Sequence, residues 1–233
     1  MALLLLLETS AVNCSVALSR DGVLMYEEVD TAGSSHSVKL GMFVDKALNI
    51  LESNNLKLDA VAVSSGPGSY TGLRIGISMA KGLCYGSRVP LIAVPTLQLL
   101  ADEVSAASNL PSNALIRPLV DARRMEVYTA LFDAKGQLLK PAEAVVVASD
   151  SFADELDAHP VWFVGDGADK CSTLLVSPNA CFEFKTVPLA GAMAPLAEKL
   201  FQANQFEDVA YFEPFYLKDF VTTTSKKPLI PKA

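Results

Sequence analysis

The segment SSGPGSYTGLRIG at residues 64–76 decides the fold of this chain. An apolar strand, Ala60 to Ser65, ends inside it, glycine and proline then turn the chain, and a helix is expected from about Leu73 to Tyr85. Free N–H groups at the start of such a helix can hold an anion. The segment is not a P-loop, because no Gly-Lys-Ser/Thr follows, and it is not a dinucleotide-binding motif, because its third glycine is displaced. The residues alone favour a structural turn, with anion binding as the alternative.

The composition favours a well-packed protein that is a poor general binder of nucleic acid. Of the 233 residues, 51% are hydrophobic and only 19% are charged, which leaves ample material for a core. The net charge of -7 opposes binding to phosphate backbones, because such binding needs Lys and Arg to replace counterions. The pairs Arg123–Arg124 and Lys226–Lys227 are the local exceptions and are interpreted as solvated surface. Any contact with RNA is therefore expected through a partner.

The cysteines and the first apolar run indicate a cytoplasmic protein without a membrane anchor. Cys14, Cys84, Cys171 and Cys181 form no C-x-x-C pair and fall in apolar segments, which is typical of buried free thiols in a reducing compartment. The run from Leu3 to Leu7 is short, follows no charged residue and ends in an acid, so it predicts a buried strand.

The chain divides into two halves that echo each other. In the first half the acid in Leu7-Glu8-Thr9 is followed seven residues later by a strand, and in the second half Val120-Asp121-Ala122 is followed in the same way. Each half then alternates strands and helices, which predicts an α/β fold with mixed sheets. Two such halves facing each other are the architecture of actin-like and ribonuclease-H-like proteins, here as duplicated βββαβαβα lobes. We expect an N-terminal lobe over residues 1–108, a C-terminal lobe over 109–221 and a mobile tail over 222–233.

Individual elements follow from the apolar patterns and turn residues. The expected strands are 3–7, 14–19, 23–28, 60–65, 91–94, 115–120, 126–132, 144–147 and 161–164. The expected helices are 36–51, 73–85, a helix capped by Thr96, 151–156, 169–176 and 189–204.

Several motifs resemble the TsaB family, also called YeaZ, and they run through nearly the whole chain in the expected order. They are LETS at 7–10, GPGSYTGLRIG at 66–76, VPTL at 94–97, VDAR at 120–123, EVY at 126–128 and PFYL at 214–217. The resemblance implies an actin-like ATPase fold that has lost catalysis, with no catalytic residue of its own. It implies a scaffold that binds a TsaD-type enzyme, which transfers threonylcarbamoyl from threonylcarbamoyl-AMP to N6 of the adenosine beside the anticodon of tRNA. A TsaE-type ATPase joins that pair, tRNA is met only through the complex, and ATP or ADP is expected at the complex interface.

The first phosphate loop departs from the pattern of an active enzyme. Actin-like ATPases have Asp-x-Gly followed by Thr or Ser, whereas this chain has a longer acid and no glycine there. We interpret six residues as a vestigial phosphate loop: Glu8, Thr9, Ser10, Gly66, Gly68 and Ser69. A plain turn acid is the alternative for Glu8.

Metal and nucleophilic chemistry have little support. TsaD-type enzymes hold a metal with two histidines four residues apart, but here His36 is followed by Leu40, and His159 is remote. No metal site is therefore expected. The alternatives to a scaffold are an active actin-like small-molecule kinase or ATPase, a peptidase using Cys84 with His36, and a homodimeric binding module.

Two helices offer a docking surface. The helix over 36–51 has one apolar stripe for the sheet, which leaves Val38 and Met42 on the opposite side. The helix over 73–85 has a wide apolar arc, and small residues recur along it every four positions, which favours close approach of another helix. A neighbouring helix of the same chain is the alternative cover. The predicted partner surface, also available for a homodimer, is Val38, Met42, Gly72, Ile75, Gly76, Met79, Ala80 and Leu83.

Overall fold

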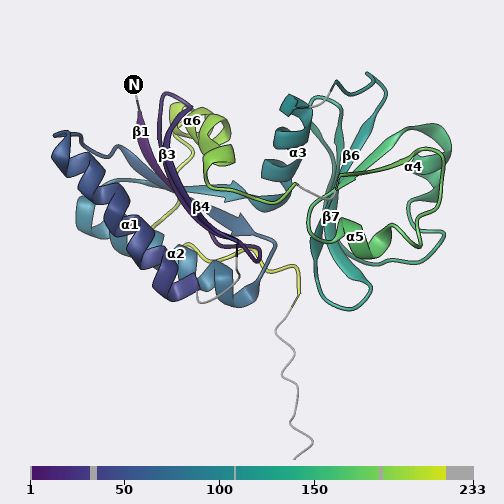
Figure 1. Ribbon diagram of the computed structural model, residues 1–233, viewed down its shortest axis with the longest axis horizontal. Coiled ribbons are helices and arrows are strands. Elements are labelled where there is room, and N and C mark those ends of the chain that lie inside the picture. Colours follow the sequence, from purple (N-terminus) through teal and green to yellow (C-terminus); the bar gives the residue numbers. More distant parts are fainter. Residues whose placement is uncertain (1, 32–35, 108, 184–185, 219–233) are drawn as a thin grey trace, which may run out of the picture.

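The computed structural model describes residues 2–31, 36–107, 109–183 and 186–218, which form two α/β lobes side by side (Figure 1). The predicted mobile tail, residues 222–233, lies outside the described residues. Within the described part, no helix is both long enough and apolar enough to cross a membrane.

The first lobe is a five-stranded sheet in the order β3-β2-β1-β4-β5, with β2 and β3 antiparallel to their neighbours and β4 and β5 parallel to β1. Odd-numbered leucines of β1 pack under α1 and α2, and even-numbered ones pack under α6, so both faces of β1 are buried. This explains the uninterrupted leucine run. The elements are β1 (Leu3–Glu8), β2 (Cys14–Arg20), β3 (Val23–Asp30), α1 (His36–Ser53), β4 (Ala60–Gly66), α2 (Tyr70–Ser87) and β5 (Leu91–Pro95).

The second lobe repeats this topology. Its sheet has the order β10-β9-β6-β7-β8, which is the order of the first sheet once β6 is matched to β1 and β9 to β4. The elements are β6 (Leu115–Asp121), β7 (Glu126–Asp133), β8 (Leu138–Val146), α4 (Ala153–Ala158), β9 (Val161–Val164), α5 (Ala168–Cys171) and β10 (Ala180–Glu183). The prediction of a duplicated actin-like α/β fold is confirmed.

The duplication extends to single hydrogen bonds. At the end of β1 the Ser10 amide donates to Glu8 Oε1 at 2.5 Å, and at the end of β6 the Arg123 amide donates to Asp121 Oδ1 at 2.8 Å. At the last residue of β4 and directly after β9 the chain turns at a glycine with positive φ, +107° at Gly66 and +103° at Gly165. Glycine tolerates this backbone conformation because it lacks a Cβ atom.

Helices cross between the lobes. Helix α3 (Thr96–Ala107) follows the first sheet but packs its apolar side on the second one, against β6 and Phe132. The turn η1 (Gly191–Met193) and helix α6 (Ala194–Gln202) follow the second sheet and pack on the first. Each lobe is therefore completed by residues from the other half of the sequence.

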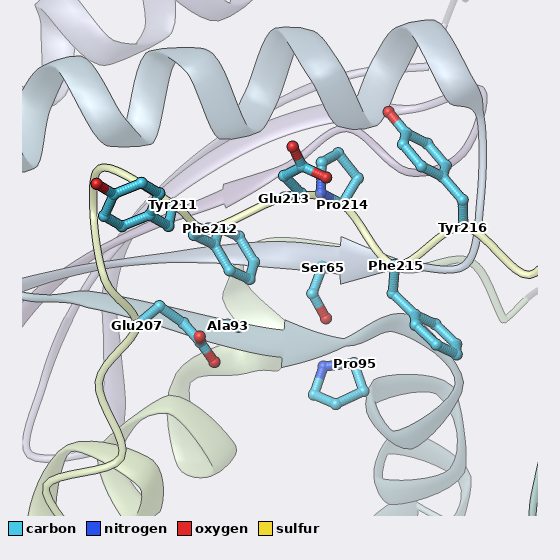
Figure 2. A pocket seen from close by; sticks show the side chains of 10 residues that line it. All are labelled: Ser65, Ala93, Pro95, Glu207, Tyr211, Phe212, Glu213, Pro214, Phe215 and Tyr216. Carbon is cyan, nitrogen blue, oxygen red and sulfur yellow. The ribbon is translucent and has the colours of Figure 1, made fainter.

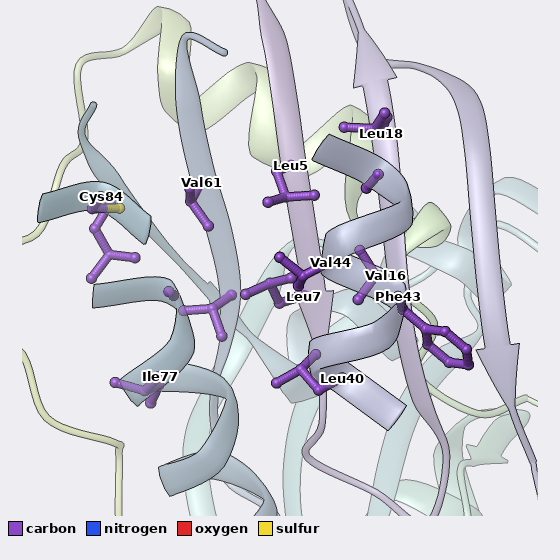
Figure 3. Close-up of a cluster of buried hydrophobic side chains, with 14 of the residues drawn as sticks. Leu5, Leu7, Val16, Leu18, Leu40, Phe43, Val44, Val61, Ile77 and Cys84 are labelled. Atoms are coloured by element: carbon purple, nitrogen blue, oxygen red, sulfur yellow. The ribbon is translucent and has the colours of Figure 1, made fainter. Parts of the chain in front are cut away.

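Helices α1 and α2 cover one face of the first sheet (Figure 3). The predicted stripe of α1 is buried there, at Leu40, Phe43, Val44, Ala47 and Leu51. These side chains interdigitate with the odd-numbered leucines of β1 and with Ile77 of α2, which fixes both helices on the sheet.

The C-terminal segment, residues 205–218, runs back along the first lobe toward the gap between the lobes. The Glu207 amide donates to Leu91 O of β5 at 2.9 Å, and the Phe215 amide donates to Ser65 O of β4 at 2.8 Å. Between these points Lys81 of α2 donates to two carbonyl groups of the segment. At its end Lys218 forms an ion pair with Glu126 of β7, so the segment bridges both lobes.

Some boundaries differ from the prediction for local reasons. Helix α2 begins at Tyr70, three residues early, because the Ser69 hydroxyl caps it by accepting from the Gly72 amide at 3.2 Å. Thr96 lies inside α3, and its buried hydroxyl has no partner among the described residues, so it is not a cap. The long final helix is a short turn plus the nine residues of α6, and β10 was not predicted.

Candidate functional site

Glu8 lies at the bottom of the first turn, fully buried. Its Oε1 accepts from the Ser10 amide and from the Ser64 hydroxyl at 2.9 Å, while Oε2 has no partner within the described part of the chain. Burial raises the pKa of this carboxyl, and the hydrogen bonds from Ser10 and Ser64 only partly oppose that rise. The geometry is that of a turn acid that holds β1, β4 and their connecting loops together.

The glycines of residues 66–76 pack directly on this turn. A methyl group built at Gly68 would lie closer than 3.0 Å to Ser10 O, and one built at Gly72 would also lie closer than 3.0 Å to Thr9 O. The Thr9 hydroxyl in turn donates to Gly72 O at 2.8 Å. The first turn and the loop at residues 66–72 therefore pack directly against each other, which leaves no space between these two loops for a bound group.

The same packing corrects the predicted docking ridge. Gly72, Gly76 and Ala80 are buried, and a methyl group at Gly76 would lie closer than 3.0 Å to Thr9 Oγ1. The small residues thus allow α2 to approach the chain's own first turn. They are not available to a partner helix, because the ridge points toward the sheet.

The turns of the two lobes border a cleft of about 620 Å³. Ser10, Gly68, Ser69 and Tyr70 line it from the first lobe. The facing wall carries Asp121, Ala122, Arg123, Tyr128 and Asp166.

Charges on the second-lobe wall are largely engaged with each other. Lys170 forms an ion pair with Asp121 and also donates to Arg124 O and Glu126 O. Asp166 Oδ1 accepts from the Asp121 amide at 2.9 Å, and burial raises the pKa of Asp166. The described residues contain no group of three or more His, Cys, Asp or Glu arranged to hold a metal ion.

Cys84 and His36 do not form a pair. The Cys84 thiol is buried and donates to Pro90 O at 3.5 Å, and burial raises its pKa to about 11. His36 Nε2 contacts Ala11 O at 3.0 Å near the cleft. A thiol with this pKa is protonated near neutral pH, which opposes its use as a nucleophile.

The outer face of α1 and α2 is the second candidate site. The two helices lie side by side on the first lobe (Figure 1). Val38 and Met42 are 59% and 52% exposed, as the periodicity of α1 predicts. On α2 three apolar side chains remain only half-buried, namely Ile75, Met79 and Leu83.

Three further glycines were missed by the sequence reasoning. Gly41 of α1 and Gly82 and Gly86 of α2 lie in helices, and a methyl group at any of them would meet nothing within 4 Å. Glycine in a helix is less stable than alanine by roughly 0.5–1 kcal/mol, and nothing inside the molecule requires it at these positions. They leave the helix surface without a side chain at these positions, and Gly41 directly precedes the exposed Met42. The one signal in the sequence for these exposed positions is the spacing of Gly41, Gly82 and Gly86 relative to the buried apolar residues of their helices.

Duplicated lobes, crossed terminal helices and a cleft between facing turns define an actin-like two-lobed protein. Residues 30–230 match the family model described as TsaD, tRNA N6-adenosine threonylcarbamoyltransferase. The chain is 34% identical over 165 residues, 70% of each chain, to tRNA threonylcarbamoyladenosine biosynthesis protein TsaB of Bacillus subtilis (strain 168). It is 29% identical over 229 residues to the Escherichia coli (strain K12) protein of the same name, over 94% of this chain and 95% of that one. Among solved structures, YeaZ from Pseudomonas aeruginosa has a TM-score of 0.74 and 25% identity, covering 93% of this chain and all of that one. This chain belongs to the TsaB (YeaZ) family.

Proposed function

We propose that this chain acts in tRNA threonylcarbamoyladenosine biosynthesis as a non-catalytic subunit that binds and activates a TsaD-type enzyme. The observation that carries the proposal is the exposed, apolar and glycine-smoothed outer face of α1 and α2. Apolar surface of this kind is typical of an interface core. The proposed contacts are Val38, Met42, Ile75, Met79 and Leu83, together with the open glycines.

Two further features support a role without catalysis. Glu8, which occupies the position of a catalytic acid in the first loop, is sealed under Ser10 and Ser64. The loops that would cradle phosphate pack on each other through Gly68 and Gly72. We therefore assign the chemistry to the enzyme partner, and ATP or ADP to the interface of the complex.

In this proposal the TsaE-type ATPase joins the assembled pair in the cytoplasm, and tRNA reaches the chain only as part of that complex. The net charge of -7 supports this division, because an acidic protein gains little from phosphate contacts of its own. In the absence of the enzyme, the same apolar face would pair two copies of this chain.

Matched substitutions test the docking face. Val38→Asp places a carboxylate in the proposed contact, whereas Val176→Asp makes the same change at a valine that is 85% exposed on the other lobe. Met42→Asp has a counterpart in Met25→Asp, at an exposed methionine of β3. A buried carboxylate without a partner weakens an apolar interface by at least about 1.4 kcal/mol, which is tenfold in affinity.

The assay is binding to a purified TsaD-type protein by calorimetry, followed by threonylcarbamoylation of tRNA with the reconstituted components. We expect Val38→Asp and Met42→Asp to lower affinity and modification about tenfold or more, while their counterparts bind normally. Unchanged binding by both α1 variants would refute the docking face. Turnover of ATP by the purified chain alone would instead favour an active actin-like kinase.

A further inference from the structure

We propose that residues 226–232 of this chain bind, within the same molecule, in a groove that the C-terminal segment forms beside β5. Their sequence is KKPLIPK, a Pro-x-x-P element with lysines on both sides. Such a segment favours the extended polyproline II conformation, which aromatic grooves recognise at low entropic cost. This inference is independent of the proposed function.

The groove is about 740 Å³ and lies where the C-terminal segment leaves the edge of the sheet (Figure 2). The segment is tied to β5 at Leu91 and to β4 at Ser65, as described above, and it arches away between these two ties. Ala93 and Pro95 of β5 line the opening, together with Ser65. An edge strand is therefore accessible between two fixed points, a situation that proteins usually cover.

Aromatic side chains dominate the wall. Tyr211, Phe212, Phe215 and Tyr216 fall within six positions and all line the groove. Tyr211 is 84% exposed, and Phe215 and Tyr216 are 48% and 39% exposed, so each ring keeps surface that a further segment could cover. Tyr216 is held in place by its contact with the Tyr70 ring, at 4.9 Å between centroids. Fixed, exposed rings beside prolines are the surface on which a polyproline II segment packs.

Charge complements the lysines of the tail. Glu207 and Glu213 line the groove, and neither side chain forms an ion pair or a hydrogen bond with another residue of the described part. Lys226, Lys227 and Lys232 carry the opposite charge. The groove therefore favours a basic segment over an acidic or neutral one.

The length of the connection favours binding within one molecule. The described chain ends at Lys218, only two residues after Tyr216 in the wall of the groove. Residues 219–225 span up to about 25 Å when extended, which allows the tail to turn back to the groove. A tether this short gives an effective concentration in the millimolar range, above that of a second copy in dilute solution.

Zero-length carbodiimide cross-linking of the full chain, read by mass spectrometry, tests the proposal. We expect links from Lys226 or Lys227 to Glu207 or Glu213. The existing Lys218–Glu126 pair provides an internal positive control. Mixing nitrogen-15-labelled and unlabelled chains separates links within one molecule from links between two. Absence of tail links when the control link forms would overturn the proposal, and so would tail links that occur only between chains.

A matched pair of substitutions tests the aromatic wall. Tyr211→Ala should lower the yield of the tail links about fivefold, which corresponds to one lost ring contact. Tyr85→Ala, at a tyrosine of α2 with the same exposure, should leave the yield unchanged. Pro228→Ala with Pro231→Ala should also lower the yield, because the tail then loses its preference for the extended form. Equal yields in all three variants would refute recognition by the groove.

Discussion

Replacing single glycines of α2 by alanine separates its inner from its outer surface. Gly76 and Gly82 lie in the same helix, neither has positive φ, and each would gain helix propensity as alanine. They differ in what the new methyl group meets. At Gly76 it would lie closer than 3.0 Å to the buried Thr9 hydroxyl, whereas at Gly82 it would meet nothing within 4 Å.

The expected magnitudes follow from these contacts. Gly82→Ala should raise the free energy of unfolding by about 0.5–1 kcal/mol, the usual difference between alanine and glycine in a helix. Gly76→Ala gains the same amount but overpacks a closed site, at about 1–3 kcal/mol. It also forces the Thr9 hydroxyl away from Gly72 O, which removes a buried hydrogen bond worth about 1 kcal/mol. The net expectation for Gly76→Ala is a loss of about 2 kcal/mol.

Urea unfolding followed by far-UV circular dichroism measures both variants. The single tryptophan, Trp162, lies in β9 of the other lobe, so its fluorescence would report on α2 only indirectly. In a chain of this size 1 kcal/mol shifts the melting temperature by about 2–4 °C, so the two variants should melt on opposite sides of the wild type. Equal stability of Gly76→Ala and Gly82→Ala would refute the packing of α2 on the first turn.

Three further predictions use the buried charges and thiols. Arg117 is 2% exposed and forms an ion pair with Glu155 at 3.0 Å, whereas Lys140 is 56% exposed and pairs with the same carboxylate oxygen. Arg117→Met should therefore lower the unfolding free energy by about 3–5 kcal/mol, and Lys140→Met should lower it by less than about 1 kcal/mol. Comparable losses in urea titrations of the two variants would contradict this. Burial raises the folded pKa of Glu8 above its ordinary 4.5, so its contribution to stability is full below pH 4.5 and declines as the pH rises. Glu8→Gln should therefore gain stability relative to wild type as the pH is raised above 4.5. A constant difference across that range would show that Glu8 is not protonated preferentially in the folded state. In the native protein the half-buried Cys181 should react with a thiol reagent before Cys14 and Cys84 do. These two thiols are buried, and burial raises their pKa values to about 11. Rapid modification of Cys84 would contradict its buried position.

Most strand positions and the duplication could be predicted because they depend on local patterns, although β8 begins at Leu138, six residues before the predicted start. The leucine run of β1 has both faces buried, and the acid-and-turn motif after β1 recurs after β6 as the same hydrogen bond. Strand β10 is short and only half-buried, so its apolar pattern is weak. The C-terminal segment has neither helical nor strand periodicity, and its course is fixed by single bonds to distant elements.

The orientation of the small residues on α2 could not be predicted from periodicity. A wide apolar arc indicates that a helix is covered on two sides, but not which molecule supplies the cover. Here the second cover is the first turn of the same chain, at Thr9, 63 residues before Gly72 in the sequence. The tertiary structure places these inner glycines against Thr9, whereas Gly82 and Gly86 of the same helix and Gly41 of α1 face open space.

The two sets of glycines also determine how binding data on this helix must be interpreted. An inner substitution such as Gly76→Ala displaces α2 from the sheet and so moves Ile75 and Met79 on the outer face without touching a partner. An outer substitution such as Gly82→Leu leaves the fold intact and adds bulk where a partner would approach. Loss of binding therefore indicates a direct contact only when the unfolding free energy of the free chain is not lowered. The proposed interface requires that Gly82→Leu weaken the complex while the free chain remains at least as stable as the wild type.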